Sequence, residues 1–121
     1  MKKRILVVED QDDKRRIMRD LLTSAGFDLI EATNGEEGVR MAETNRPDLI
    51  LMDIQMPVLD GYSATRRIKA SVELRDIPIV VVTSYALSGD DAKAREAGAD
   101  GYVAKPFSPR ELLAKIRQFL P

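Results

Sequence analysis

The sequence predicts an α/β fold in which five parallel strands form one sheet and helices cover both of its faces. Short aliphatic runs alternate with amphipathic segments along all 121 residues. Such alternation is typical of a parallel sheet whose strands are joined by helices. Three of the runs are almost entirely aliphatic, as strands are when both of their faces are buried. We therefore expect a single doubly wound (βα)5 domain over residues 1–121.

The order of the strands follows from how apolar each one is. The strands are expected at residues 4–8, 28–32, 48–52, 78–82 and 100–104. The first, third and fourth are the most aliphatic and should lie at the centre, which leaves the second and fifth at the edges. The predicted order is therefore 2-1-3-4-5. Its switch point lies between strands one and three, and ligands bind outside the carboxyl ends of the strands at such a point.

The last and first helices have the clearest signals. The last one has Ser108 as its cap, Pro109 at its first helical position and Glu111 to complete a capping box. The first is expected from Asp12 to Ala25, before Gly26. Its helical period places four apolar residues on one face, which we expect to be buried: Ile17, Leu21, Leu22 and Ala25.

The three middle helices are predicted from their ends. Residues 33–36, Thr-Asn-Gly-Glu, indicate a capping box that opens the second helix. The third follows the Asp-Gly pair at 60–61 and runs to Ala70. The fourth is expected over residues 88–97 and is closed by Gly98, since glycine favours helix ends.

Composition excludes several classes of function. The chain has no cysteine and no histidine, which excludes disulfides, thiolate or histidine zinc sites and imidazole catalysis. Its formal net charge of -1 offers no basic surface for nucleic acid. No apolar run reaches membrane-spanning length, and the N-terminus lacks the apolar core of a secretion signal. We therefore expect a cytoplasmic protein that neither binds nucleic acid directly nor inserts into a membrane.

Acidic residues follow two of the central strands. Glu9 and Asp10 come after the first strand and Asp53 after the third. Parallel strands bring these carboxylates to one edge, where they repel one another unless a cation relieves the repulsion. Oxygen ligands of this kind suit Mg2+, with Mn2+ as an acceptable substitute. We expect Asp10 and Asp53 to bind the ion directly, the carbonyl of Gln55 to join them, and Glu9 to act partly through water.

A lysine and a hydroxyl are expected at the same edge. Lys105 follows the fifth strand and Thr83 the fourth. The ammonium group and the cation could together neutralise a phosphoryl group on Asp53. An aspartate can accept a phosphoryl group, and the threonine hydroxyl could donate to one of its oxygens. The residues thus indicate phosphoryl transfer to Asp53.

Together the motifs resemble the receiver domain of two-component response regulators. They are Val-Val-Glu-Asp at 7–10, Leu-Met-Asp-Ile-Gln-Met-Pro at 51–57, Asp-Gly at 60–61, Val-Val-Thr-Ser at 81–84 and Lys-Pro-Phe at 105–107, and they span the chain. The resemblance implies a flavodoxin-like receiver fold with a cis peptide at Lys105-Pro106. It also implies a set of roles: Asp53 as phosphoacceptor, Glu9 and Asp10 as the acidic pair, Thr83 as switch hydroxyl, Tyr102 as switch aromatic and Lys105 as pocket lysine.

The resemblance also implies a function. Asp53 would take a phosphoryl group from a histidine kinase or a histidine phosphotransfer protein, and the change would alter the face made by the fourth helix, fifth strand and fifth helix. Such a protein is a signalling switch that assists its own phosphorylation and dephosphorylation and acts on a downstream protein. Gln55 and Tyr85 are expected to tune the lifetime of the phosphoryl group. The predicted recognition surface for the phosphodonor is Asp12, Arg15, Arg19 and Phe107.

Other functions fit less well. A flavodoxin-like electron carrier needs a phosphate loop after its first strand, where this chain has Glu-Asp-Gln-Asp-Asp at 9–13. A haloacid-dehalogenase-type phosphatase has its nucleophile after the first strand and a second aspartate two residues on, whereas Asp53 follows the third strand and Gln55 stands at the second place. A phosphorylation-independent scaffold is disfavoured by the intact acid set. The likeness is greatest to stand-alone receivers of the cell-cycle kind, because Pro121 ends the last helix, although a receiver cut from a longer regulator or hybrid kinase would look the same.

Overall fold

A single parallel sheet forms the centre of the domain. The computed structural model describes residues 2–83 and 90–121, and only the backbone of residues 83, 90 and 91. Within these residues the strands are β1 (Arg4–Val8), β2 (Asp28–Ala32), β3 (Leu49–Asp53), β4 (Ile79–Thr83) and β5 (Gly101–Ala104). Their order, β2-β1-β3-β4-β5, confirms the predicted topology. The last three strands begin one residue later than predicted, so Asp53 and Thr83 are the final residues of their strands.

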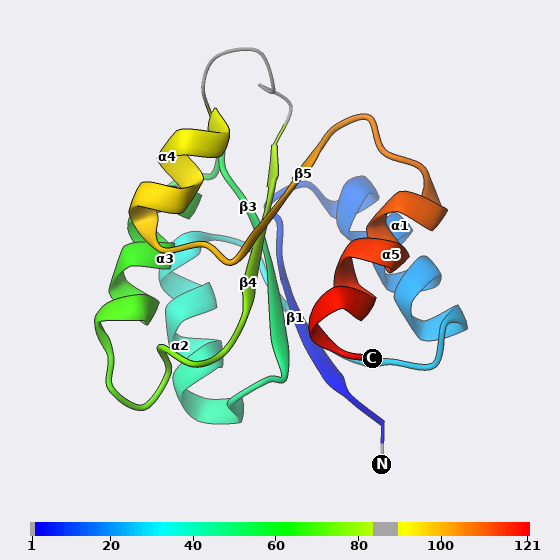
Figure 1. Cartoon of the computed structure of the whole chain (residues 1–121), viewed down its shortest axis with the longest axis horizontal. Coiled ribbons are helices and arrows are strands. Elements are labelled where there is room, and N and C mark those ends of the chain that lie inside the picture. Colours follow the sequence, from blue (N-terminus) through cyan, green and yellow to red (C-terminus); the bar gives the residue numbers. More distant parts are fainter. Residues whose placement is uncertain (1, 84–89) are drawn as a thin grey trace.

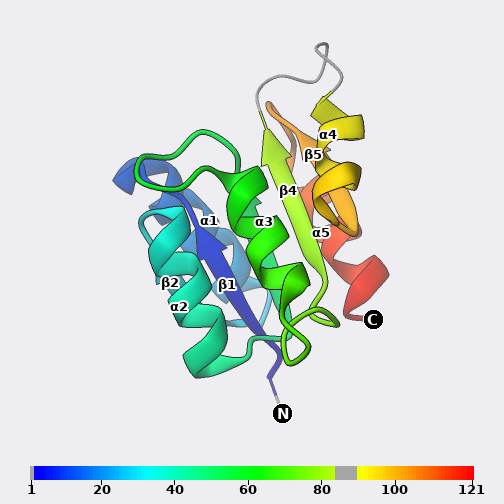
Figure 2. The same ribbon diagram turned by 90° about the vertical axis from the view of Figure 1, so that its left-hand side faces the viewer.

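Helices cover both faces of this sheet. They are α1 (Asp12–Ser24), α2 (Gly35–Asn45), α3 (Gly61–Ala70), α4 (Asp90–Ala97) and α5 (Pro109–Phe119). In Figure 1 the sheet is seen nearly edge-on, with α1 and α5 on one side and α2, α3 and α4 on the other. The same arrangement can be followed in the turned view of Figure 2. The predicted start of the fourth helix at Ser88 lies outside the described residues.

The core consists of two apolar clusters, one on each face of the sheet. Along β1, Leu6 and Val8 belong to the cluster beneath α2, α3 and α4, whereas Ile5 and Val7 belong to the cluster beneath α1 and α5. Successive side chains of a strand point to opposite faces, so a strand buried on both sides must be apolar at every position. This explains why the central strands are continuous aliphatic runs. Burial on both faces also holds the carboxyl ends of these strands in register at one edge of the sheet.

The helix caps confirm one prediction and correct another. The Ser108 hydroxyl accepts a hydrogen bond from the Glu111 amide at 3.1 Å, as predicted for α5. At α2 the predicted capping box over residues 33–36 was wrong by one residue. Asn34 is the cap and accepts from the Glu37 amide at 2.8 Å, while the Glu37 carboxylate accepts from the Thr33 amide at 3.1 Å. Two neighbouring cap formers and two neighbouring glutamates allow either register, and the packing of α2 selects one.

The buried face of α1 differs from the prediction at one position. Ile17 is 65% exposed, whereas Met18 and Leu22 are buried against the sheet. Helical spacing allowed both pairs, because Ile17 with Leu21 and Met18 with Leu22 are each four residues apart. The sheet lies against the second pair, which leaves Ile17 on the surface. Among residues 2–83 and 90–121, no helix combines the length and apolar character needed to cross a membrane.

Candidate functional site

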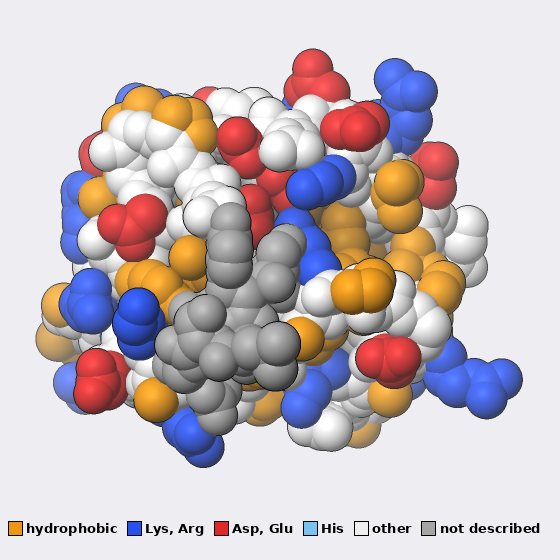
Figure 3. Space-filling view, turned by 90° about the horizontal axis from the view of Figure 1, so that it is seen from above, with side chains coloured by type: hydrophobic (Ala, Val, Ile, Leu, Met, Phe, Trp, Pro, Cys, Tyr) orange, Lys and Arg blue, Asp and Glu red, His pale blue; other side chains and the backbone are white. Residues whose placement is uncertain are grey.

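Three carboxylates meet at the carboxyl edge of the sheet. Val8 pairs with Met52, so the next residues along the chain, Glu9 and Asp53, emerge side by side. One carboxylate oxygen each from Glu9, Asp10 and Asp53 lies within 4.8 Å of the others. Glu9 is buried and the other two are half-buried. Figure 3 looks onto this edge and shows acidic and basic side chains together near the middle of the face, next to hydrophobic ones.

Lys105 joins these acids from the end of β5. Its Nζ lies 3.3 Å from Oε1 of Glu9 and 3.4 Å from Oδ1 of Asp53. The Lys105 side chain is only 19% exposed, so the two ion pairs are partly shielded from solvent. The peptide bond between Lys105 and Pro106 is cis, as the resemblance implied. Lys105 pairs with two of the three carboxylates, so these four side chains together carry an excess of negative charge.

The surroundings of Asp10 disfavour the charged form of its carboxyl group. Burial raises the pKa of its carboxyl group, and the hydrogen bond and negative charge of Glu9 raise it further. Its Oδ1 is buried and has no hydrogen-bond partner among the described residues. A buried carboxylate oxygen without a partner is costly unless a cation binds to it. The set of hard oxygen donors, their spacing and this unpaired oxygen fit Mg2+.

The remaining predicted site residues lie at or near this edge. Thr83 ends β4, and its backbone is in register with Ala104, the residue before Lys105, although its side chain lies outside the described residues. Gln55 is in the loop after Asp53 and has an exposed side chain. Tyr102 is half-buried in β5 and packs against the cluster beneath α4. The roles of Thr83, Gln55 and Tyr102 remain predictions, and Tyr85 lies outside the described residues.

A cavity of about 540 Å³ lies next to the acids, between α1 and the loop after β5. Apolar residues from the sheet and α1 form much of its lining, namely Val7, Val8, Met18, Leu51 and Val82. The charged residues Glu9, Asp53 and Lys105 line it as well. Lys14, Ile17, Pro106 and Phe107 complete it. Sequence analysis missed Lys14 and Ile17 as residues near the site. The helical period of the apolar residues could not identify Ile17 as a site residue, because it assigned Ile17 to the core.

The predicted recognition residues differ in their exposure and in their contacts within the domain. Asp12 has an 86% exposed side chain, and Phe107 is half-buried and lines the cavity. Arg15 and Arg19 both form ion pairs with Glu31 of β2, and the Arg15 side chain is only 13% exposed. The contact of any of these residues with a partner remains a prediction.

Comparisons with known proteins agree with this geometry. Residues 5–117 match the family described as response regulator receiver domain. The polar-differentiation response regulator DivK of Brucella anthropi is 38% identical over 120 residues, which cover 99% of this chain and 98% of that protein. DivK of Brucella ovis is 37% identical over the same share of both chains.

Solved structures with the same architecture include the receiver domain of a sensor histidine kinase and a chemotaxis protein. The receiver domain of the sensor histidine kinase PA1611 of Pseudomonas aeruginosa, with magnesium coordinated in its active site cleft, is 40% identical, with a TM-score of 0.93 over 99% of this chain and 98% of that one. The chemotaxis protein CheY4 of Vibrio cholerae is 26% identical, with a TM-score of 0.92 over 98% and 99%. This chain is therefore similar both to the response regulator DivK and to the receiver domain of a sensor histidine kinase.

Proposed function

Because the chain belongs to the response regulator receiver domain family, we propose that it is a phosphorylation-controlled switch with Asp53 as its phosphoacceptor. The phosphoryl donor is a phosphohistidine on a histidine kinase or a histidine phosphotransfer protein. The observation that carries the proposal is the position of Asp53, at the end of a central strand, 3.4 Å from Lys105 and clustered with two further acids.

The transfer itself needs few groups from the protein. An oxygen of the Asp53 carboxylate attacks phosphorus, a P–O bond forms, and the P–N bond to the donor imidazole breaks with its electron pair on nitrogen. Glu9, Asp10 and Asp53, with the carbonyl of Gln55, would hold Mg2+, which neutralises charge on the phosphoryl oxygens when it is bound. Lys105 Nζ supplies a second positive charge beside Oδ1 of Asp53.

The output follows from residues at the same edge of the sheet. Thr83 would donate its hydroxyl to the phosphoryl group, and Tyr102 would move inward on β5, which changes the face made by α4, β5 and α5. Tyr102 lines a second cavity of about 210 Å³ together with Ala94 of α4 and Lys115 of α5, so it borders both helices of the face that would change. The altered face would then bind a downstream protein.

Labelling with acetyl phosphate tests the assignment. Wild type should become labelled only with Mg2+ or Mn2+ present, and Asp53→Asn should not be labelled, since an amide of nearly the same shape cannot attack phosphorus. Asp13→Asn is the matched control, because Asp13 is an exposed acid on α1 outside the cluster. Labelling of Asp53→Asn at the wild-type rate would show that the acceptor is another residue. Unchanged labelling in EDTA would refute the dependence on a metal ion.

A receiver within a longer sensor kinase is the second candidate, because this chain is as similar to the PA1611 receiver as it is to DivK. Both assignments use the same acceptor chemistry. They differ in whether the domain acts as a separate regulator or is covalently joined to a kinase. Sequencing the reading frame on both sides of residues 1–121 distinguishes them, because a kinase domain joined to this one would establish the second candidate.

A further inference from the structure

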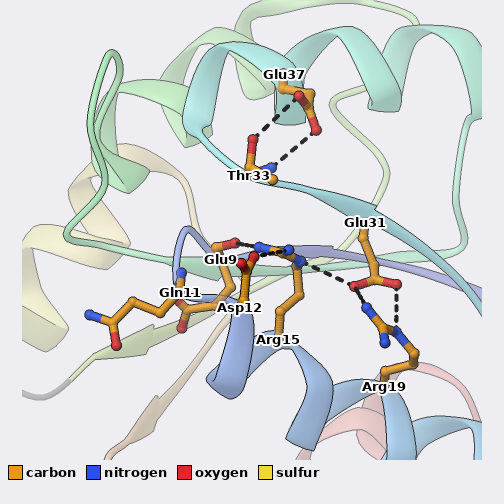
Figure 4. A network of polar contacts seen from close by, with 8 residues as sticks. All are labelled: Glu9, Gln11, Asp12, Arg15, Arg19, Glu31, Thr33 and Glu37. Carbon is orange, nitrogen blue, oxygen red and sulfur yellow. Dashed lines mark hydrogen bonds and ion pairs between the residues drawn. The ribbon is translucent and has the colours of Figure 1, made fainter.

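Arg15 connects three separate parts of the chain beside the acidic cluster. Its Nη1 donates to the main-chain oxygen of Glu9 at 2.9 Å, and its Nε donates to Oε1 of Glu31 at 3.2 Å. Its Nη2 pairs with the carboxylate of Asp12. Figure 4 shows the guanidinium between Glu9 and Glu31, with Arg19 on the far side of Glu31. All three nitrogens of the group are therefore in use within the domain.

The contact with Glu9 fixes the segment that carries two of the acids. The Glu9 carbonyl belongs to the peptide that joins Glu9 to Asp10, so its orientation helps to set where both carboxylates point. The Glu9 amide is also held, because it donates to the Ala32 oxygen of β2 at 3.0 Å. Arg15 is itself anchored to β2 through Glu31. Both polar groups of the Glu9 main chain are thus tied to β2, one directly and one through Arg15.

The charge of Arg15 is neutralised by its neighbours, so its effect on a bound cation would come from the groups that it holds in place. Arg15 and Arg19 are paired with Asp12 and Glu31, and together these four side chains carry no net charge. The guanidinium therefore adds little repulsion toward a cation bound nearby. It differs in this from Lys105, whose ammonium group faces Glu9 and Asp53 directly.

We propose that Arg15 is a positioning residue for the magnesium site, where it holds the Glu9–Asp10 peptide through its contact with the Glu9 oxygen. This inference rests on the proposed function, because it requires that the acidic cluster binds Mg2+. The role needs arginine. A planar guanidinium donates in three directions at once, whereas a lysine ammonium at this place cannot reach Glu9, Asp12 and Glu31 together. Groups that orient metal ligands typically change metal affinity about 10–100-fold when they are lost.

Substitution by lysine separates position from charge. Arg15→Lys keeps the positive charge but loses the fixed fork, and we expect it to raise the Kd for Mg2+, measured by titration calorimetry, by roughly 10-fold. Arg19→Lys is the matched control. Arg19 lies one helical turn further along α1 and donates to the same Glu31 through two hydrogen bonds of 2.8 Å, neither of which involves Glu9. Its Mg2+ affinity should stay within about twofold of wild type.

Thermal unfolding in EDTA shows whether the variants are folded, and Arg15→Gln provides a second variant if Arg15→Lys is not. Mg2+ affinity unchanged in a folded Arg15 variant, even with a lower Tm, would mean that Arg15 is only structural and would overturn the inference. An equal loss in Arg19→Lys would assign the effect to the Glu31 ion pair instead and would overturn it as well. Absence of Mg2+ binding by wild type would refute the proposed function itself, so the two failures are distinguishable.

Discussion

A methyl group on Gly61 would stand 2.0 Å from the main-chain oxygen of Asp53. The same glycine donates its amide to the Ile54 oxygen at 2.9 Å, which closes the loop between β3 and α3. The start of α3 therefore rests directly on the backbone of the proposed phosphoacceptor. No side chain fits between them unless one of the two segments moves.

Gly61→Ala should displace Asp53 and slow labelling by acetyl phosphate. A Cβ so close to backbone forces a shift, and overpacking of this kind costs about 1–3 kcal/mol of unfolding free energy. Misplacement of the accepting carboxylate should lower the labelling rate roughly 10-fold or more. Gly101→Ala is the control, because its Cβ would contact the Phe119 side chain at 3.1 Å, away from the acids. It should cost some stability and leave the labelling rate as in wild type. Equal rates in both variants would contradict the prediction.

Asp10→Asn should stabilise the metal-free protein and remove its response to Mg2+. The pKa of Asp10 is raised by burial and by Glu9, so its ionised form is less favourable in the folded state than in the unfolded chain. The substitution removes that charge, and Tm in EDTA should rise. Addition of Mg2+ should raise Tm of wild type and have little effect on the variant. Asp13→Asn should behave as wild type in both respects, and a lower Tm of Asp10→Asn in EDTA would count against this account.

The ion pairs of Glu31 should make stability depend on pH in acid. The hydrogen bond from Arg19, with the charges of Arg19 and Arg15, holds the pKa of Glu31 below its ordinary value of 4.5. A carboxyl group whose pKa is lower in the folded than in the unfolded state stabilises the fold at any pH above its unfolded-state pKa. This contribution is lost as the pH falls through the folded-state pKa. Glu31→Gln should therefore cost roughly 1 kcal/mol at pH 7. Urea unfolding of both proteins should show the difference shrinking below pH 4.5; a difference that is constant with pH would exclude this mechanism.

Val58→Asn should stabilise the protein. Val58 lies in the loop after Asp53, is 79% exposed and has a φ of 71°. The Leu59 amide donates to the Pro57 oxygen at 2.8 Å, so Val58 is the central residue of a strained γ-turn. A β-branched residue at positive φ is strained by about 1–3 kcal/mol, whereas asparagine adopts positive φ more often. We expect a gain of roughly 1 kcal/mol in unfolding free energy, measured with urea. Val72→Asn is the matched control, since Val72 is 73% exposed and is not among the positive-φ residues. Equal effects at both positions would show that loss of an exposed apolar side chain is responsible.

Ile17→Asp should slow phosphoryl transfer from a phosphohistidine protein. Ile17 is exposed and lines the cavity beside Asp53, where a protein donor must approach but acetyl phosphate need not touch α1. Transfer from the protein should fall roughly 10-fold or more, as for a residue central to an interface, and acetyl phosphate labelling should not change. Val72→Asp makes the same kind of change at an exposed valine away from the cavity and should affect neither reaction. Charge reversal at Arg15 is a poorer test, because it also breaks the contact with Glu9.

The sequence by itself determined the architecture and the members of the acidic site. Continuous aliphatic runs identified the central strands, and the polar residues directly after the predicted strands identified Glu9, Asp10, Asp53 and Lys105. This was possible because strand burial, helix capping and the parallel arrangement each leave local signals within a few residues. Parallel strands then bring their endings together without any knowledge of individual contacts.

Only the tertiary structure decided which of several equivalent local patterns is used. It buried Met18 and exposed Ile17, chose Asn34 as a cap, and set Gly61 against Asp53. It also paired Arg15 with the Glu9 carbonyl and with Glu31, 16 residues further along the chain. Helical period and capping preferences are nearly degenerate between neighbouring residues, and a side-chain contact across strands depends on register and rotamer. Packing against the sheet selects among these alternatives, because burial and long-range hydrogen bonds exist only once distant segments have come together.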